Sequence, residues 1–343
     1  MLCVFTSWGA SCGQGGRVAD NTPLEPVEIL GGVGTNPGQL FYPRAIDADE
    51  HSLWVIDKTG RIQRLDPRSG NSLGEWRMPE TRLGMPTGVT SFTDAAGEVF
   101  LYVPDTHYHR VAVYRVGPVG SSDVSLVGEF GSYGTAGGEF IYPTDIAILP
   151  TPDGGGVSRI FVSEYGGNDR VSVFDSSYRF LFAIGQPDGS DPSVVFGRPQ
   201  SLAIDAEHGW LFVADSANHR VGKFTIDGTF MRWFGSPDGP GREPGEFRYP
   251  YGLTVLHDGT LVVTEFGNCR VQRIDVETGR VVRMEGRAGR GPGELASPWA
   301  SVALGRRLYV LDSGNNRIQV LDWRLSGGRS AARTESTAGR GGG

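Results

Sequence analysis

A short motif recurs six times along the 343-residue chain, and this recurrence limits the fold more than any other feature. Each copy ends a β-rich run at an acidic residue, passes through a short polar turn and resumes at an arginine. The clearest copies are VADSANHRV at 213–221, VTEFGNCRV at 263–271 and VLDSGNNRI at 310–318. The period is about 50 residues, which indicates a repeat architecture with one supersecondary unit per copy.

Each unit has the composition of four short strands. A proline opens an apolar run before the acid, as in PTDIAIL and PYGLTVL, and two further runs follow the arginine, as in VSVFD and FLFAIG. Glycine (52 residues) and proline (21 residues) separate these runs, and no apolar run approaches the ~20 residues of a membrane helix. A four-stranded unit of this length is a propeller blade. The sequence therefore predicts an all-β fold, a six-bladed β-propeller of four-stranded antiparallel blades.

The two ends of the repeat region complement each other. The last unit lacks its fourth run, whereas VEILG at 27–31 precedes the first unit as an unmatched run. We expect this N-terminal strand to close the last blade and leave no open sheet edge at the seam. The chain then divides into a signal-like or lipoprotein-like remnant and linker (1–26), the propeller (27–323) and a disordered Gly/Arg/Ser-rich tail (324–343).

The repeated motifs resemble the NHL repeat family of six-bladed β-propellers. SLAID followed by VADSANHRV is similar to that family's Pro-x-Gly-Ile/Leu-Ala-Val-Asp and Val-Ala-Asp-x-x-Asn-His-Arg pattern. The resemblance covers roughly 27–323 and implies the fold. It does not imply an activity, because one fold supports many functions.

The acid and the arginine of each copy are expected to be structural, because six identical catalytic pairs would serve no purpose. An acid at a turn accepts backbone N–H groups, and an arginine four to six residues later can pair with it. The pairs are Asp57 with Arg61, Asp105 with Arg110, Glu164 with Arg170, Asp215 with Arg220, Glu265 with Arg270 and Asp312 with Arg317.

Function is expected where the blades differ, on the face that carries the loops before each proline and the acid–Arg turns. The residue after each proline varies in chemistry and should line the rim of the central channel. Asp145 replaces a small residue next to the rim, and it either bonds to local backbone or acts as a channel acid. The expected ligand-binding residues are Arg44, Thr87, Thr144, Asp145, Gln200, Tyr251, Trp299, His107, Tyr108, Tyr165 and Phe266.

Three functions are compatible with these residues. The first is a non-catalytic scaffold that recognises a protein, peptide or glycan through aromatic side chains on the top face. The second is a metal-dependent enzyme similar to peptidyl-amidoglycolate lyases or lactonases, with zinc or calcium in the channel. No catalytic residue or metal-ligand set is assigned, and no cofactor is predicted for the scaffold. The third is RNA binding, which the net charge of −7 disfavours.

The N-terminal segment is similar to the end of a bacterial lipoprotein signal, with Cys12 as the candidate lipidation site. This similarity predicts attachment at the cell envelope, with contact to the membrane only through that lipid. Without lipidation, a cytoplasmic location is the alternative.

Overall fold

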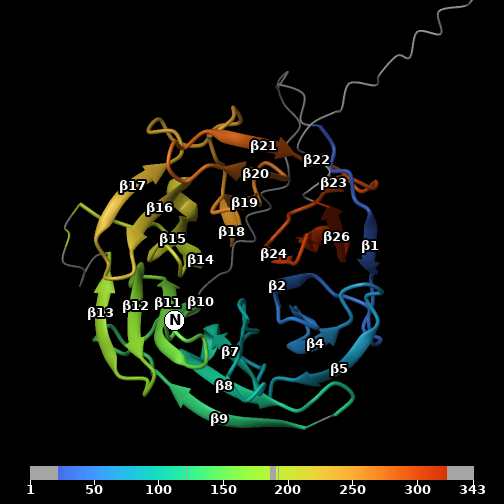
Figure 1. Ribbon diagram of the computed structural model, residues 1–343, viewed down its shortest axis with the longest axis vertical. Helices are drawn as coiled ribbons and strands as arrows, with labels where there is room; N and C mark the ends of the chain where they lie inside the picture. Colours follow the sequence, from blue (N-terminus) through green and yellow to red (C-terminus); the bar gives the residue numbers. More distant parts are fainter. Residues whose placement is uncertain (1–21, 122, 186–190, 192, 323–343) are drawn as a thin grey trace, which may run out of the picture.

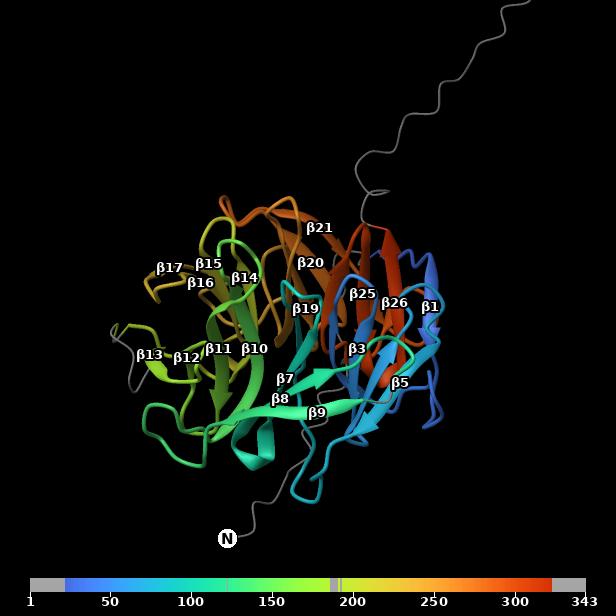
Figure 2. The same ribbon diagram turned by 60° about the horizontal axis from the view of Figure 1, so that its bottom comes forward.

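The computed structural model describes residues 22–121, 123–185, 191 and 193–322. These residues form six four-stranded antiparallel sheets around a central axis, as Figure 1 shows from the end and Figure 2 obliquely. The predicted six-bladed β-propeller is confirmed. Across the described ranges, the helical elements are three short 3-10 helices, η1 (Thr106–Tyr108), η2 (Ser216–Asn218) and η3 (Ser313–Asn315). No helix in this part of the chain has the length and hydropathy to cross a membrane.

Every blade contains an inner, a second, a third and an outer strand, and the blades are numbered 1 to 6 along the chain. The inner strands are β2 (Pro43–Ala48), β6 (Thr90–Thr93), β10 (Tyr142–Pro150), β14 (Pro199–Asp205), β18 (Pro250–Val255) and β24 (Ser301–Leu304). The second strands are β3 (Leu53–Asp57), β7 (Val99–Asp105), β11 (Val157–Tyr165), β15 (Trp210–Asp215), β19 (Leu261–Glu265) and β25 (Arg307–Asp312). The third strands are β4 (Arg61–Leu65), β8 (Arg110–Val116), β12 (Arg170–Asp175), β16 (Arg220–Thr225), β20 (Arg270–Ile274) and β26 (Arg317–Asp322). The outer strands are β5 (Ser72–Arg77), β9 (Val124–Phe130), β13 (Phe180–Ile184), β17 (Phe230–Phe234), β21 (Val281–Glu285) and β1 (Glu28–Gly31). A short parallel pair, β22 (Arg287–Ala288) and β23 (Glu294–Leu295), lies in the loop before blade 6.

The hydrophobic core lies between the blades rather than inside any one of them. Six clusters of buried residues are present, and each joins two adjacent blades, as Phe161 of blade 3 and Val213 of blade 4 do in one cluster. Each twisted sheet is apolar on both faces, so each blade needs a neighbour on either side. The Leu or Phe three residues before the proline, such as Leu40 and Phe247, is completely buried between blades.

The ring closes through the N-terminal strand, as the sequence predicts. β1 pairs antiparallel with β26, and Glu28, Leu30 and Gly31 lie opposite Val320, Ile318 and Arg317. Leu30 is 3 % exposed and packs with residues of blades 6 and 1. This strand therefore supplies both a sheet edge and part of an interblade core.

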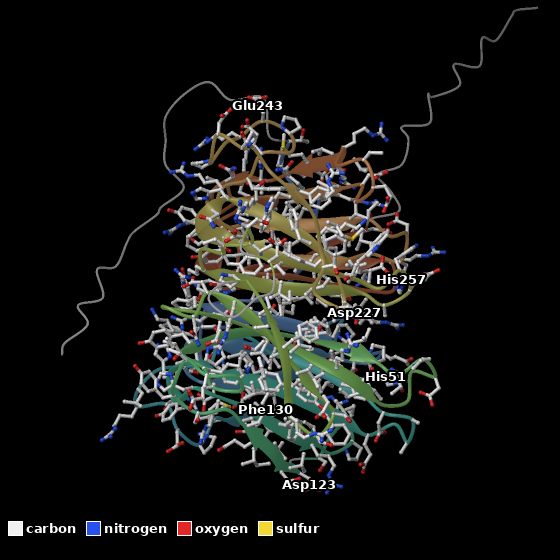
Figure 3. The ribbon with its side chains drawn as sticks, turned by 90° about the vertical axis from the view of Figure 1, so that its left-hand side faces the viewer. His51, Asp123, Phe130, Asp227, Glu243 and His257 are labelled. Atoms are coloured by element: carbon white, nitrogen blue, oxygen red, sulfur yellow. The ribbon has the colours of Figure 1, made fainter. Side chains whose placement is uncertain are left out.

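The register of the blades places two sets of loops on one face. Pro43 at the start of β2 is opposite Asp57 at the end of β3, and Pro250 is likewise opposite Glu265. The loops that enter the inner strands and the acid–Arg turns therefore share one face, called the top face below. The turns after the inner strands lie at the other end of the blades. Figure 3 shows two of them, at His51 and His257, along one edge of the molecule.

If β1 closes the ring, replacing Leu30 should destabilise the protein much more than replacing its neighbour Ile29. Leu30→Ala should lower the free energy of unfolding by about 2–5 kcal/mol, because it removes buried methyl groups at the seam. Urea denaturation followed by tryptophan fluorescence measures this change. The control is Ile29→Ala in the same strand, where the side chain is 40 % exposed and the loss should be within about 0.5 kcal/mol. Equal losses for the two variants would contradict the closure.

Candidate functional site

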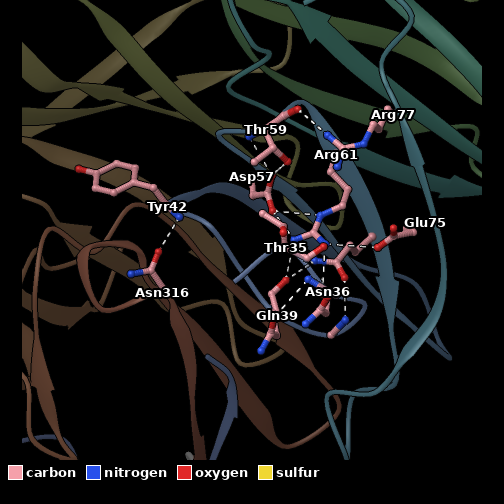
Figure 4. Close-up of polar contacts among 12 residues, drawn as sticks. Thr35, Asn36, Gln39, Tyr42, Asp57, Thr59, Arg61, Glu75, Arg77 and Asn316 are labelled. Atoms are coloured by element: carbon pink, nitrogen blue, oxygen red, sulfur yellow. Dashed lines mark hydrogen bonds and ion pairs between the residues drawn. The ribbon is translucent and has the colours of Figure 1, made fainter. Parts of the chain in front are cut away.

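The arginine of each blade pairs with its acid, and in blades 1, 3, 4, 5 and 6 it also bonds to backbone carbonyls of the top-face loop that precedes it. Figure 4 shows this arrangement in blade 1, where Arg61 donates from Nη2 to Oδ2 of Asp57 at 2.7 Å. The same guanidinium donates to the backbone carbonyls of Thr35 (2.7 Å), Asn36 (3.1 Å) and Gln39 (2.7 Å). The arginine therefore joins the acid–Arg turn to the loop that leads into the inner strand.

The other five blades also contain the acid–arginine pair. The N–O distances are 3.1 Å for Arg110–Asp105, 2.8 Å for Arg170–Glu164, 2.8 Å for Arg220–Asp215, 2.5 Å for Arg270–Glu265 and 2.7 Å for Arg317–Asp312. Burial is the largest influence on Glu265, and it raises the pKa of that carboxyl in spite of Arg270. These are the six acid–arginine pairs that were expected from the sequence to have a structural role.

A glutamine two residues after the arginine extends this network in three blades, and the sequence analysis missed it. Gln63 donates to the carbonyl of Gln39 and accepts from the N–H of Gly38. Gln272 and Gln319 make the equivalent contacts in blades 5 and 6. The recurring Arg-x-Gln in RIQ, RVQ and RIQ was a signal that could have revealed it.

In four blades, the side chain immediately before the arginine bonds to the next blade. Asn316 has a φ of 56° and accepts from the N–H of Tyr42 at 2.7 Å, from blade 6 to blade 1. His219, with the same φ, accepts through Nδ1 from the N–H of Tyr249 at 3.1 Å. His109 likewise contacts the carbonyl of Ile141. The histidines of the turns therefore have a structural contact between blades.

His107 and His109 are two residues apart, a spacing that in a strand would put both side chains on one side, but neither residue lies in a strand. His107 lies in η1, and His109 follows it with a φ of 58°. The left-handed residue reverses the chain there, so the alternation of a strand does not apply.

Inner strands do not pair across blades, so side chains bond to their backbone groups instead. Thr90 donates to the carbonyl of Ile146 and Thr254 to that of Ser301. The strands also approach closely, because a Cβ added at Gly252 would lie 2.7 Å from Cα of Ala300. Small residues next to the rim are thus required by space at the axis.

Two carboxylates of the channel wall bond to the blade that follows their own. Oδ2 of Asp47 accepts from the backbone N–H and hydroxyl of Ser91 at 2.5 and 2.8 Å. Oδ2 of Asp145 accepts from the N–H of Leu202 at 2.9 Å. Both side chains line the central channel, a cavity of about 260 Å³. Burial raises the pKa of Asp47 to about 6 and that of Asp145 to about 7, and the charge of Asp47 contributes to the second shift.

The residues expected at the rim divide into two groups. Arg44, Thr87, Tyr251 and Trp299 line the channel together with Asp145. Thr144 and Gln200 are instead buried beside it, where Thr144 bonds to Ser163 and to the carbonyl of Pro199 and Gln200 accepts from Arg198.

Aromatic rings and two guanidiniums surround the channel mouth. Arg44 of blade 1 lies over Trp299 of blade 6 at 5.7 Å, and Trp299 contacts Tyr251 of blade 5 at 5.1 Å. Arg198, which precedes blade 4, lies over Tyr251 at 5.6 Å and over Tyr165 of blade 3 at 4.9 Å. We call these five residues the mouth ring.

Three more aromatic residues expected from the sequence, His107, Tyr108 and Phe266, lie in the acid–Arg turns of the top face. Phe266 stacks on Tyr251 with ring centroids 4.6 Å apart. The pKa of His107 is lowered by burial and by the positive charge of Arg44. The hydroxyl of Tyr108 accepts from the N–H of Leu83 at 3.3 Å. Arg198 was missed because the sequence analysis considered residues after the prolines and not those before them.

The described residues do not provide a three-ligand metal site. Throughout these residues, no group of three His, Cys, Asp or Glu side chains is arranged to hold a metal ion. His219 lies in the top-face turn of blade 4, whereas His257 follows the inner strand of blade 5 at the opposite face, so these two histidines do not meet. The zinc arrangement of the lyase alternative therefore does not fit the histidines described. Cys269, in the turn of blade 5, is buried and disulfide-bonded.

The acid–arginine pairs predict a graded loss of stability. Arg270 is fully buried, so Arg270→Gln should lower the free energy of unfolding by about 3–5 kcal/mol, because it leaves Glu265 buried without its cation. Arg110→Gln is the matched control, because 21 % of the Arg110 side chain is exposed and water can replace its contacts. Chemical denaturation of both variants measures the difference. A larger loss for Arg110→Gln would contradict this explanation.

The channel carboxylates predict a pH dependence with a defined sign. Their pKa values are raised in the folded state, so the folded protein binds these protons more tightly than the unfolded chain. Their contribution to stability is present at low pH and is lost as the pH rises through 6 and 7. Relative to the Asp47→Asn, Asp145→Asn double variant, the wild-type free energy of unfolding should fall by about 1 kcal/mol or more between pH 5 and pH 8. If the wild-type free energy of unfolding relative to the double variant stays constant or rises between pH 5 and pH 8, the pKa values of the two carboxylates are not raised in the folded state.

Comparisons with known proteins agree with the repeat and the architecture. The NHL repeat model matches residues 196–224. The chain is 27 % identical to protein brain tumor of Drosophila melanogaster over 147 residues. This aligned segment covers 43 % of this chain and 12 % of that protein. It is 37 % identical to peptidyl-glycine alpha-amidating monooxygenase A of Xenopus laevis over 91 residues, and this segment covers 26 % of this chain and 10 % of that protein. The chain thus matches only about a tenth of the length of either relative.

The solved structures show the same fold at low sequence identity. Virginiamycin B lyase from Staphylococcus aureus superposes with a TM-score of 0.52 at 18 % identity, covering 85 % of this chain and 87 % of the lyase. At this identity the likeness concerns the fold alone. The repeat match and the six blades together show that the chain contains an NHL repeat and folds as a six-bladed β-propeller.

Proposed function

We propose that the protein is a binding scaffold that recognises a protein, peptide or glycan partner at the top face of its propeller. The proposal includes attachment to the cell envelope through Cys12, a residue that lies outside the described part of the chain. No chemical step is assigned to the scaffold.

One observation carries the proposal, which is the mouth ring. Trp299 and Tyr251 of the mouth ring form a contiguous aromatic cluster with the adjacent Phe266, with ring centroids 4.6 to 5.9 Å apart. Aromatic anchors that surround a recess supply much of the energy at binding sites. Five blades contribute to the ring, so a partner that contacts it would bind to the assembled propeller and not to a single repeat.

A larger cavity elsewhere on the molecule is a weaker candidate for the binding site. It has a volume of about 780 Å³ and lies between blades 1 and 2, beside the turn of His51 at the opposite face. Its arginines already have carboxylate partners, since Arg64 lies 3.7 Å from Asp49 and Arg115 lies 3.6 Å from Glu98. The mouth ring contains cations that lack such partners among the described residues, and for this reason we assign recognition to it.

Two tryptophans at opposite ends of the blades provide the test. Purified protein is applied to arrays of random peptides and of glycans, and the affinity of each bound probe is then measured in solution. Trp299→Leu should weaken the selected probes by about 10-fold or more, as expected for an aromatic anchor. Trp210→Leu is the control, because Trp210 begins β15 at the opposite face. The proposal would be contradicted if the selected probes bound Trp299→Leu as tightly as Trp210→Leu. It would also be contradicted if no peptide or glycan on the arrays bound to the protein.

The alternative function is a metal-dependent enzyme with its site in the channel. The observation that favours it is the pair of channel acids with raised pKa values, Asp47 and Asp145. The names of two similar proteins, a monooxygenase and a lyase, describe enzymes. The metal content of the purified protein, measured by elemental mass spectrometry, separates the two functions. About one zinc or calcium per chain after dialysis would favour the enzyme over the scaffold.

A further inference from the structure

Arg44 and Arg198 differ from the arginines of the repeat because they form no ion pair. In the described part of the chain, no carboxylate oxygen lies within 4.0 Å of either guanidinium, whereas all six repeat arginines contact an acid. Nε of Arg44 is inaccessible to solvent and has no hydrogen-bond partner. The nearby Asp169 bonds to the backbone N–H of Arg198, at 2.6 Å, rather than to its guanidinium. A partly buried cation without a partner is costly, unless a ligand supplies one.

The two guanidiniums lie close enough to repel each other across the mouth. The pKa of Arg44 is lowered by burial, and the charge of Arg198 lowers it further. Arg198 has a φ of 58° immediately before Pro199, and the residues before the equivalent prolines, Tyr42, Tyr249 and Ser297, adopt the same left-handed conformation. The repeat therefore sets the direction from which Arg198 reaches the mouth, where the protein maintains two like charges close together.

An anion between the guanidiniums would satisfy both of them. Guanidinium groups bind carboxylates through paired N–H donors, and such hydrogen bonds are stronger in a partly buried setting. Further into the channel, Asp47 and Asp145 would repel a ligand with several negative charges. A ligand with a single carboxylate is therefore favoured over a phosphate or a polyanion.

The surroundings of the anion indicate what the rest of the ligand contains. Tyr165, Tyr251 and Trp299 surround the guanidiniums with apolar surface, and Ile148 and Val302 line the channel. A single carboxylate next to one apolar side chain is the chemistry of the last residue of a peptide. The cavity of about 260 Å³ has room for such a terminal group rather than for a continuous chain.

We propose that Arg44 and Arg198 together bind the C-terminal carboxylate of a peptide, whose last side chain contacts the aromatic residues of the mouth ring. This inference rests on the proposed scaffold function and specifies its partner as a free peptide C-terminus. The rest of the peptide would extend outwards over the top face.

A paired library tests the inference directly. Random hexapeptides are synthesised twice, once with a free C-terminal carboxylate and once with a C-terminal amide, so that each pair differs only in that group. Wild-type protein should bind selected free acids and bind their amides about 10- to 100-fold more weakly, which is the range for loss of one charge-assisted hydrogen bond. Arg44→Gln and Arg198→Gln should each weaken the free acids by a similar factor.

A third arginine is the control for these substitutions. Arg82 is exposed in the loop before blade 2, on the same face and outside the mouth ring, so Arg82→Gln should change binding by less than about twofold. Thermal unfolding of the three variants checks that each is folded. The side chain of Arg44 makes no hydrogen bond within the described residues, so replacing this unpaired cation should not lower the melting temperature.

The outcomes separate the inference from the function on which it rests. Peptides that bind equally as acids and amides, and that are lost in Trp299→Leu, would overturn the carboxylate site and leave the scaffold standing. Binding that is equally reduced in Arg82→Gln would also overturn the site, because it would reflect general charge attraction. If neither library contains a binder, the carboxylate site is overturned, and glycan binding decides the scaffold.

Discussion

The contact on which the rest of this structure depends is the ion pair of the arginine at the start of each third strand, an arginine that is completely buried in blades 1, 3 and 5. In blade 1, its guanidinium is shared between Asp57 and three carbonyls of the preceding loop. A charge buried in this way is stable only when nearly all its donors are satisfied, so the loop is held in one conformation. Because the same loop leads into the inner strand, the arginine also fixes where that strand begins at the channel. The mouth ring is thus positioned by residues that do not belong to it.

The repeat made most of the fold predictable. Six copies of the acid–Arg motif give the number of blades, and the unmatched VEILG segment gives the closure, because both depend on spacing along the chain. The contacts between blades were not predictable in this way. The hydrogen bond from Ser91 to Asp47 joins residues 44 positions apart, and it depends on how one inner strand lies against the next. The bond between His219 and Tyr249 likewise requires a left-handed residue that the strand pattern did not indicate.

The candidate site was predictable only in part, and the physical reason is again backbone geometry. Arg44, Tyr251 and Trp299 were expected at the rim because they follow a proline that begins an inner strand. Thr144 occupies the equivalent position in blade 3, but its hydroxyl can bond to Ser163 and to the next blade, and it is buried instead. Arg198 precedes its proline and reaches the mouth from a left-handed backbone conformation, which it shares with Tyr42, Tyr249 and Ser297 and which the strand pattern does not indicate.

The antiparallel direction of β1 and β26, the two strands that close the ring, has a mechanical consequence. Glu28 at the start of β1 is opposite Val320 near the end of β26, so the incoming and outgoing ends of the propeller emerge together. A force that separates these ends would load the backbone hydrogen bonds of the seam one after another, in the manner of a zipper, rather than all at once in shear. Blade 6 is therefore expected to open first under tension, while the other five blades keep their covalently continuous sheets.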